Sequence, residues 1–424
     1  MTTTSDRPST APAAPTLAVE VDPGEVGLDS TRLQRLDSHF QRYVDDGRLA
    51  GWLLAVTRGG KIAHLASAGH RDTEDSQPVT PDTIWRIYSM TKPITSVAAL
   101  MLWEEGRFEL KDPVSKFLPE FEGQKVWRSG SATTPVLDPV TEPMEMWHLM
   151  THTSGLTYGF LYAHPVDELY RRGGFEWGVP QDASLGDICS KLAELPLLFQ
   201  PGTEWNYSMS IDVLGRVLEV LEGKSLGEIL QERIFDPLGM VDTGFSVPEE
   251  SADRLAILYG AHPTTRLASR LEAAGAAALR PPAAHLGGGG LVSTAGDYLR
   301  FAEMLRREGE FHGSRLLSPR TVRYATSNHL PENLDLTAFG RPLFSETAFD
   351  GVGFGLIGSV TIDPIAAKVP ASLGDYGWGG AASTSFWVDP VEDITCVFMT
   401  QLLPSSTHPI RPQLKQLVSQ AIID

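Results

Sequence analysis

The chain has 424 residues, which is enough for a large hydrophobic core and for two lobes. Hydrophobic residues make up 42% of the chain and aromatic residues 8%, as is typical of globular proteins. The formal net charge of −18 argues against a protein that binds nucleic acid or an anionic membrane surface.

The N-terminal residues 1–22 are rich in Thr, Ser, Pro and Ala and are predicted to form a disordered tail. They contain no apolar segment of the kind found in secretory leaders, and the chain has no run of 18 apolar residues. We therefore expect a cytoplasmic protein that binds no membrane. The two cysteines, Cys189 and Cys396, are too few for a disulfide framework and stand alone, which argues against a cysteine metal site.

Apolar residues recur every three or four positions over residues 28–48, which predicts an amphipathic helix. The apolar runs 52–57 and 62–67, joined by a turn at Arg58–Lys61, predict a β-hairpin. A second helix is predicted over residues 90–105. Residues 122–146 hold clusters of Gly, Ser, Thr and Pro and are predicted to be a loop that leads into a second region.

Three helices are predicted beyond this loop, over residues 185–195, 211–221 and 226–233. The run Gly287–Gly290 is interpreted as a hinge-like joint before a helix over residues 295–307. Two strands and a helix are predicted to end the chain, over residues 384–388, 394–400 and 410–423.

Strand patterns thus stand at both ends of the chain, with helices between them. We therefore expect an α/β lobe built from residues 23–121 and 286–424, and a mostly helical domain over residues 122–285.

The chemistry centres on Ser89-Met90-Thr91-Lys92 at the start of the second helix. A Ser three residues before a Lys places the hydroxyl and the ammonium one turn apart on one helix face. A buried Lys with a lowered pKa can remove the proton from the Ser, which then becomes a nucleophile. Backbone N–H groups at the helix start can stabilise an oxyanion. The plain alternative is a Ser that caps the helix beside an exposed Lys.

Three other patterns compete with this one. Gly223-Lys224-Ser225-Leu226-Gly227 matches the nucleophile elbow of α/β-hydrolases, but helices rather than a strand precede Ser225, so a capping Ser is favoured. The dinucleotide-like run 353–358 is followed by a strand pattern and is interpreted as a Gly-rich strand. His148 and His152 have zinc-like spacing but no evident third ligand, so no metal is predicted.

Two later segments complete a candidate site. Tyr207 stands just before a predicted helix, where a Tyr that shares a proton with Lys92 can serve as the base for Ser89, although a core Tyr is the plain alternative. Trp378-Gly379-Gly380-Ala381 precedes a strand. Its glycines allow a ligand to approach the backbone, and the Ala381 N–H can complete an oxyanion hole.

The order Ser-x-x-Lys, His-Thr-Ser-Gly-Leu (152–156), Tyr-Ser before a helix, and Trp-Gly-Gly resembles the class C β-lactamase-related serine hydrolases. Within that group the chain is most similar to the family VIII carboxylesterases. The resemblance spans residues 25–420 and implies an α+β, serine β-lactamase-like fold, with an antiparallel sheet flanked by helices and a mostly helical second domain. It implies Ser89 as nucleophile, Lys92 and Tyr207 as the general-base pair, and the N–H groups of Ser89 and Ala381 as the oxyanion hole.

Two positions depart from the β-lactamase pattern. The Tyr-x-Asn motif is replaced by Tyr207-Ser208-Met209, and Lys-Thr-Gly is replaced by Trp378-Gly379-Gly380. Loss of that Lys removes a charge-assisted contact to a substrate carboxylate, which favours neutral esters.

We therefore predict hydrolysis of short-chain carboxylic esters through a Ser89 acyl-enzyme, with a small-molecule substrate and without a cofactor. The alternatives are an acyltransferase that uses the same intermediate, a weak β-lactamase or peptidase-like amide hydrolase, and a non-catalytic binding protein on the same fold.

An aromatic segment, Thr157–Tyr162, follows the His-Thr-Ser-Gly-Leu block. Tyr158 and Phe160 are predicted to line an apolar substrate wall, with Trp378, Gly379 and Gly380 beside the oxyanion hole. Packing between the two lobes is an equal alternative for this segment.

Overall fold

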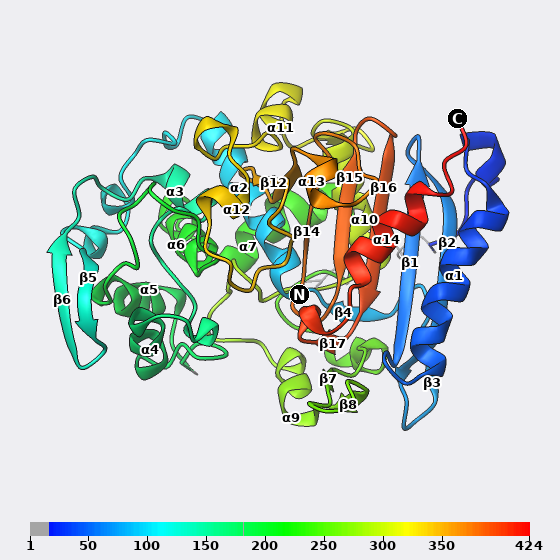
Figure 1. Ribbon diagram of the computed structural model, residues 1–424, viewed down its shortest axis with the longest axis horizontal. Coiled ribbons are helices and arrows are strands. Elements are labelled where there is room, and N and C mark those ends of the chain that lie inside the picture. Colours follow the sequence, from blue (N-terminus) through cyan, green and yellow to red (C-terminus); the bar gives the residue numbers. More distant parts are fainter. Residues whose placement is uncertain (1–16, 181) are drawn as a thin grey trace, which may run out of the picture.

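The computed structural model describes residues 17–180 and 182–424, and these form a mixed structure around one large antiparallel sheet (Figure 1). The strand order is β12-β13-β14-β15-β16-β1-β2-β3, with every neighbouring pair antiparallel. These strands are β1 (Gly51–Arg58), β2 (Lys61–Asp72), β3 (Gln77–Pro78), β12 (Val352–Phe354), β13 (Ser359–Thr361), β14 (Tyr376–Gly379), β15 (Ser385–Asp389) and β16 (Ile394–Thr400).

The central strands are buried on both faces. In β1, Leu53 and Ala55 belong to one core cluster, whereas Leu54 and Val56 belong to the other. Because successive side chains of a strand point to opposite faces, each cluster fills one side of the sheet. The predicted hairpin of β1 and β2 is confirmed, and β1 pairs with β16 from the other end of the chain.

Helices cover both faces of the sheet. α1 (Ser30–Asp45) and α14 (Ile410–Ser419) pack against one face, whereas α2 (Thr91–Glu104) and α10 (Ala295–Arg306) lie on the other (Figure 1). The remaining helices are α3 (Met146–Met150), α4 (Pro165–Arg172), α5 (Leu185–Glu194), α6 (Ser210–Glu222), α7 (Leu226–Leu230), α8 (Asp236–Leu238), α9 (Glu272–Gly275), α11 (Pro319–Ala325), α12 (Leu336–Phe339) and α13 (Pro364–Ala367). Among the described residues, no helix has both the length and the apolar character that a bilayer crossing requires.

Four small sheets complete the chain. They are β4 (Ile84–Arg86) with β9 (Val292–Thr294), β5 (Lys125–Ser131) with β6 (Thr134–Pro139), β10 (Glu310–Phe311) with β11 (Ser314–Arg315), and β7 (Tyr259–Ala261) between β8 (Ala268–Arg270) and β17 (Leu402–Leu403). The β5–β6 hairpin corrects the loop predicted for residues 122–146. Only Val126 in these two strands is buried, so the sequence lacks the apolar alternation by which strands are recognised.

The predicted α+β fold with an antiparallel sheet flanked by helices is confirmed. The bounds of a separate helical domain over residues 122–285 stay a prediction. Of the predicted disordered tail, residues 1–16 lie outside the described part. Residues 17–22 differ from the prediction, because the N–H groups of Glu20 and Val21 donate to the carbonyl of Ile62 on β2.

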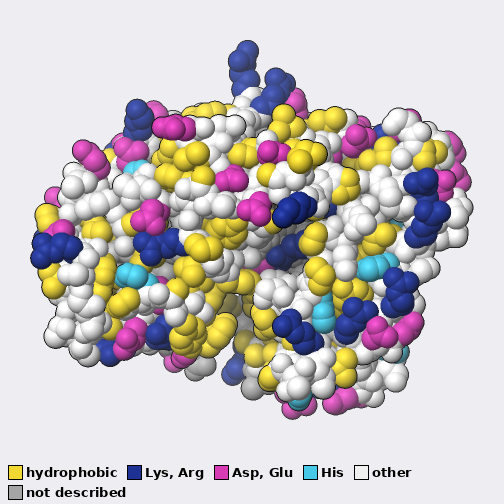
Figure 2. Space-filling view, in the orientation of Figure 1, with side chains coloured by type: hydrophobic (Ala, Val, Ile, Leu, Met, Phe, Trp, Pro, Cys, Tyr) yellow, Lys and Arg dark blue, Asp and Glu magenta, His cyan; other side chains and the backbone are white. Residues whose placement is uncertain are grey.

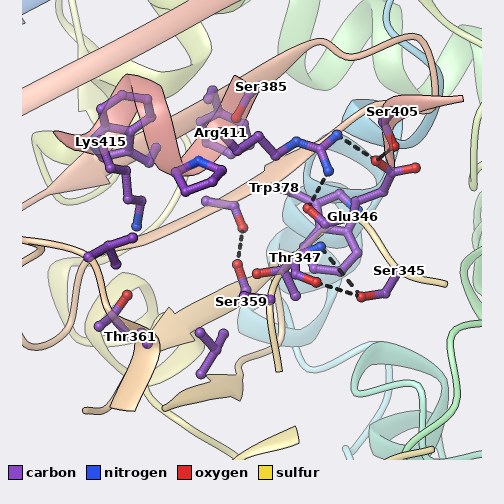
Figure 3. A pocket seen from close by; sticks show the side chains of 18 of the residues that line it. Ser345, Glu346, Thr347, Ser359, Thr361, Trp378, Ser385, Ser405, Arg411 and Lys415 are labelled. Carbon is purple, nitrogen blue, oxygen red and sulfur yellow. Dashed lines mark hydrogen bonds and ion pairs between the residues drawn. The ribbon is translucent and has the colours of Figure 1, made fainter. Parts of the chain in front are cut away.

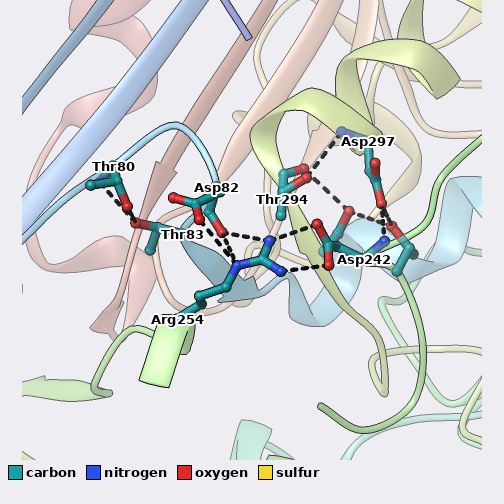
Figure 4. Close-up of polar contacts among 9 residues, drawn as sticks. Thr80, Asp82, Thr83, Asp242, Arg254, Thr294 and Asp297 are labelled. Atoms are coloured by element: carbon teal, nitrogen blue, oxygen red, sulfur yellow. Dashed lines mark hydrogen bonds and ion pairs between the residues drawn. The ribbon is translucent and has the colours of Figure 1, made fainter. Parts of the chain in front are cut away.

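A polar cluster supports the short β4–β9 ladder that leads into the Ser89 segment (Figure 4). Arg254 donates two hydrogen bonds to Asp242 and two to the carbonyl of Asp82. Asp297, in the first turn of α10, accepts from the Asp242 N–H at 2.7 Å and from the Thr243 hydroxyl at 2.9 Å. Burial raises the pKa of Asp297 to about 6.

Candidate active site

Ser89 lies on a single turn of 3₁₀-helix, Tyr88–Met90, between β4 and α2. Its side chain is almost enclosed, with 8% of the residue exposed. The preceding Tyr88 has a φ of +43°, a conformation that residues with a side chain rarely adopt. The chain therefore makes a tight turn just before Ser89, and the predicted helix follows at Thr91.

Lys92 lies in the first turn of α2 and is buried. Its Nζ lies 3.3 Å from Ser89 Oγ and donates to the carbonyl of Gly288 at 2.5 Å. Burial lowers the pKa of Lys92 to about 8, although the charges of Asp212 and Glu346 act in the opposite direction. The plain alternative of an exposed Lys is therefore wrong, and a fraction of Lys92 is a neutral amine at neutral pH.

The glycine run 287–290 holds Lys92 in place. The Gly288 N–H donates to Asp212 Oδ1 at 2.9 Å, and the Gly288 carbonyl accepts the hydrogen bond from Lys92 Nζ. Asp212 therefore fixes the glycine to which Lys92 binds. A Cβ at Gly287 would lie 2.6 Å from the Ile211 carbonyl, and one at Gly288 would lie 2.5 Å from Asp212. The sequence suggests a hinge-like joint for this run, but in the structure the absence of side chains permits close packing against α6.

Tyr207 lies just before α6, and its ring packs beside the side chain of Lys92. The centre of its ring lies 4.6 Å from Lys92 Nζ, and the edges of His152 and Trp378 pack around it at 5.1 and 5.5 Å. Burial and the charge of Glu346 raise the pKa of Tyr207 well above its usual value, so the phenol is protonated. Its hydroxyl faces Ser89 and Trp378 without a well-aligned hydrogen bond to a described residue.

The Trp378–Ala381 segment forms the end of β14 and the turn after it. Gly380 donates to the Thr384 carbonyl at 2.9 Å, and a side chain on Gly380 would overlap the carbonyl of Ile87. This close approach brings the turn that carries Ala381 next to the segment that carries Ser89. The Ala381 N–H donates to no residue of the described chain, so it is available to a ligand.

Aromatic rings continue outward from Tyr207. Tyr158 packs edge-on against Tyr207 at 5.3 Å and stacks on Phe160 at 4.7 Å. Phe160 in turn stacks on Trp177, which is 76% exposed. Figure 2 shows hydrophobic side chains near α4, beside a hollow that separates this part from β7 and β8.

The motifs that compete with the Ser89 segment in the sequence have other roles in the structure. Ser225 caps α7: its hydroxyl accepts from the Glu228 N–H and donates to the Glu228 carboxylate at 2.7 Å. His148 accepts from the Glu145 N–H, whereas His152 lies beyond the end of α3 and bonds Ser208, so the two do not share a helix face. Of the run 353–358, which is interpreted in the sequence as a Gly-rich strand, only residues 353 and 354 belong to a strand, whereas residues 355–358 connect it to the strand 359–361 that the sequence predicts.

Three functional candidates were missed in the sequence: Asp212, Glu346 and Arg411. Arg411 on α14 donates to the Glu346 carboxylate and to the Gly380 carbonyl. Arg411, Glu346 and Trp378 line a cavity of about 310 Å³ (Figure 3). Asp212 follows a predicted helix start, but Glu346 lies in an irregular segment without a motif. No pattern in the sequence signals contacts between residues so far apart.

Comparison with known proteins agrees with this geometry. The Beta-lactamase family model matches residues 36–420. Esterase EstB of Burkholderia gladioli is 33% identical over 400 residues, which cover 90% of this chain and 94% of that one. Protein Rv1367c of Mycobacterium tuberculosis is 36% identical over 369 residues, which cover 86% of this chain and 89% of that one.

Among solved structures, EstCE1, described as a hydrolase with promiscuous acyltransferase activity, superposes with a TM-score of 0.77. It is 28% identical, and the match covers 93% of this chain and 99% of that chain. The predicted resemblance to β-lactamase-related serine hydrolases is thereby confirmed. With the fold, the family model and these relatives in agreement, this chain belongs to the beta-lactamase family.

Proposed function

We propose that the chain is a serine carboxylesterase that hydrolyses short-chain esters through an acyl-enzyme on Ser89. The observation that carries the proposal is the buried Lys92, whose Nζ lies 3.3 Å from Ser89 Oγ and whose pKa is lowered to about 8. A neutral amine at that distance can accept the hydroxyl proton. The similarity to EstB, which is named as an esterase, supports the same reaction class.

The reaction proceeds in two balanced halves. Neutral Lys92 takes the proton of Ser89 while Oγ bonds to the ester carbonyl carbon, and the N–H groups of Ser89 and Ala381 receive the oxyanion. Collapse of this intermediate breaks the ester bond, and the alkoxide leaves with a proton passed through the Tyr207 hydroxyl from Lys92. Water then attacks the acyl-enzyme by the same route and releases the acid and free Ser89.

The substrate wall is proposed to consist of Tyr158 and Phe160, with Trp378, Gly379 and Gly380 on the opposite side. The edge-on contacts of Tyr158 and Trp378 with Tyr207, and the stacking of Tyr158 on Phe160, support this assignment. Trp378 stands where a β-lactamase has a Lys, so the wall offers an apolar surface in place of a cation.

The test of the reaction is a burst of p-nitrophenol from p-nitrophenyl acetate or butyrate, with the acyl group found on Ser89 by mass spectrometry of the trapped enzyme. Absence of turnover across acetyl to hexanoyl esters contradicts the proposal. An acyl label on Ser225 would instead identify Ser225 as the nucleophile. A non-catalytic binding protein would show neither burst nor label, and Ser89→Ala would leave its ligand affinity unchanged.

Acyl transfer is the second candidate, because the similar protein EstCE1 is described as having that activity beside hydrolysis. An alcohol competing with water captures the same intermediate. The ratio of new ester to free acid, measured at increasing alcohol concentration, separates a transferase from a hydrolase. Nitrocefin reports amide hydrolysis of the β-lactam kind.

The wall has its own test. Tyr158→Ala and Phe160→Ala are expected to change the acyl chain-length preference, with the exposed and distant Tyr324→Ala as a matched aromatic control. Loss of thermal stability with an unchanged chain-length profile would show that these rings serve packing only.

A further inference from the structure

The environment of Glu346 has no counterpart in the motifs that define the candidate site. Glu346 lies in the irregular segment between α12 and β12, and its side chain is 1% exposed. One carboxylate oxygen accepts from Ser405 Oγ at 2.8 Å and from Arg411 Nη2. The other oxygen, Oε1, has no hydrogen-bond partner in the described part of the chain. Burying a carboxylate is costly unless it is paired and hydrogen-bonded, and for Glu346 this pairing comes from Arg411.

Arg411 donates to the protein through both of its Nη atoms, whereas its Nε has no partner among the described residues. Its Nη1 donates to the backbone carbonyl of Glu346 at 2.7 Å, and its Nη2 donates to the carbonyls of Gly380 and Thr384 at 3.1 and 3.3 Å. Its guanidinium packs across Gly379 so closely that no side chain fits at that position. The cation that lies nearest to the Trp378–Ala381 segment is therefore already neutralised by Glu346 (Figure 3).

The charge of Glu346 also reaches the reacting groups. It raises the pKa of Lys92, of Tyr207 and of Tyr158, although it makes no hydrogen bond to any of them. Asp212 acts on Lys92 in the same sense from α6. The site thus has two carboxylates around Lys92, and Arg411 adds no free positive charge. A substrate that brings another carboxylate would therefore find no free cation at Arg411 to compensate its charge.

We infer that the Glu346–Arg411 pair determines specificity: by neutralising Arg411 beside the Trp378–Ala381 segment, Glu346 denies a carboxylate-bearing ester the cation that would bind it and confines the enzyme to esters with uncharged groups. This inference rests on the proposed esterase function and extends it to the class of substrate. The replacement of the β-lactamase Lys by Trp378 does not by itself have this effect. Trp378 replaces one cation of the β-lactamase pattern, whereas Glu346 neutralises another cation, Arg411.

The experiment compares two esters of equal size that form the same acetyl-enzyme, 4-acetoxybenzamide and 4-acetoxybenzoate. The wild-type enzyme is expected to have a kcat/KM at least about tenfold higher for the neutral amide-bearing ester, with the difference mainly in KM, because the charge acts on ground state and transition state alike. A second pair, p-nitrophenyl hexanoate and the mono-p-nitrophenyl ester of adipic acid, places the carboxylate on the acyl side.

Glu346→Gln keeps the shape, removes the charge and leaves Arg411 without its counter-charge. The variant is expected to bring the neutral-to-anionic ratio below about threefold in at least one pair. The ratio is taken within one enzyme, so a change in the pKa of Lys92 affects both members of a pair equally and cancels. Glu346→Asp keeps the charge and should retain the discrimination. Glu303→Gln is the matched control, because Glu303 is likewise buried and ion-paired with Arg306 but is not among the charges that shift the pKa of Lys92 or Tyr207.

The outcomes are distinct. A folded Glu346→Gln enzyme with unchanged ratios for both pairs overturns the inference, and so does an equal loss of activity on neutral and anionic esters. If that variant fails to fold, the wild-type ratios still decide, because equal use of both members of each pair overturns the inference by itself. No turnover of any of the four esters by the wild type is instead the failure of the proposed function, and the inference falls with it.

Discussion

The starts of α2 and α7 each carry a Ser and a Lys within four residues, but only at α2 are both side chains buried. At α2, Lys92 is buried and its pKa is lowered to about 8, with Nζ 3.3 Å from Ser89 Oγ. At α7, Lys224 is exposed, and a hydrogen bond to Glu232 raises its pKa, while Ser225 caps the helix. The local patterns are alike, so the difference comes from what the rest of the chain packs around each Ser.

The largest expected effect separates the two serines. Ser89→Ala should lower kcat/KM for p-nitrophenyl butyrate by at least about a thousandfold, because the nucleophile is lost. Ser225→Ala should leave kcat/KM within about twofold and cost about 1 kcal/mol of folding stability, as expected for loss of a helix cap. Ester kinetics and urea unfolding of both variants check this pair, and a reversed result would exchange the roles of the two serines.

The next largest effect on the rate compares Lys92 and Tyr207 with Lys224. Lys92→Ala and Tyr207→Phe should each lower kcat by several orders of magnitude, and the double variant should be little worse than either, because the two groups handle one proton as a unit. Lys224→Ala, the control from the second helix start, should keep wild-type rates. Losses that add fully in the double variant would show that Lys92 and Tyr207 act independently.

The pH dependence of kcat/KM tests the protonation of Lys92. The acid limb of kcat/KM should fall near pH 8, because Lys92 must lose its proton to act as base. The groups that face Lys92 are the carboxylates Asp212 and Glu346 and the neutral side chains His152, Tyr158 and Tyr207.

Since the Asp212 charge raises the pKa of Lys92, Asp212→Asn should move this limb to lower pH by roughly one unit. The measurement is kcat/KM from about pH 6 to 10 for both enzymes. A limb that stays in place would exclude Asp212 as the group that tunes Lys92.

The smallest effect extends the comparison to carboxylates in the first turn of a helix. Burial raises the pKa of Asp297 on α10 to about 6, whereas the hydrogen bond from Ser225 lowers the pKa of the exposed Glu228 on α7. A carboxylate with a raised folded-state pKa stabilises the fold below its unfolded pKa, and this contribution is lost as the pH rises through the folded value.

The wild type should therefore lose up to about 3 kcal/mol of stability between about pH 4 and 7 through Asp297. Asp297→Asn removes this dependence, whereas Glu228→Gln leaves it in place. Urea unfolding of each variant at both pH values measures this change in the free energy of unfolding. An equal pH dependence in the wild type and Asp297→Asn would mean that Asp297 ionises normally.

Local sequence determined much of the secondary structure, since apolar periodicity identifies α1, α2, α6 and α10, and alternating or continuous apolar runs identify β1, β2, β15 and β16. It also pointed to Ser89, Lys92, Tyr207 and Ala381 through the order of short motifs, and the structure brings their segments together. The polar β5–β6 hairpin was missed because strand prediction depends on an apolar face that this hairpin lacks.

Only the tertiary structure decided what those residues can do. Burial of Lys92, the hydrogen bond from Gly288 to Asp212, and the pairing of Arg411 with Glu346 join residues that lie from 65 to more than 190 positions apart along the chain. A short motif places a Ser and a Lys on one helix face, but their proton affinities depend on desolvation and on charges supplied by distant segments. The local sequence thus identifies the candidate pair, whereas the burial and the charges around it come from the packed fold.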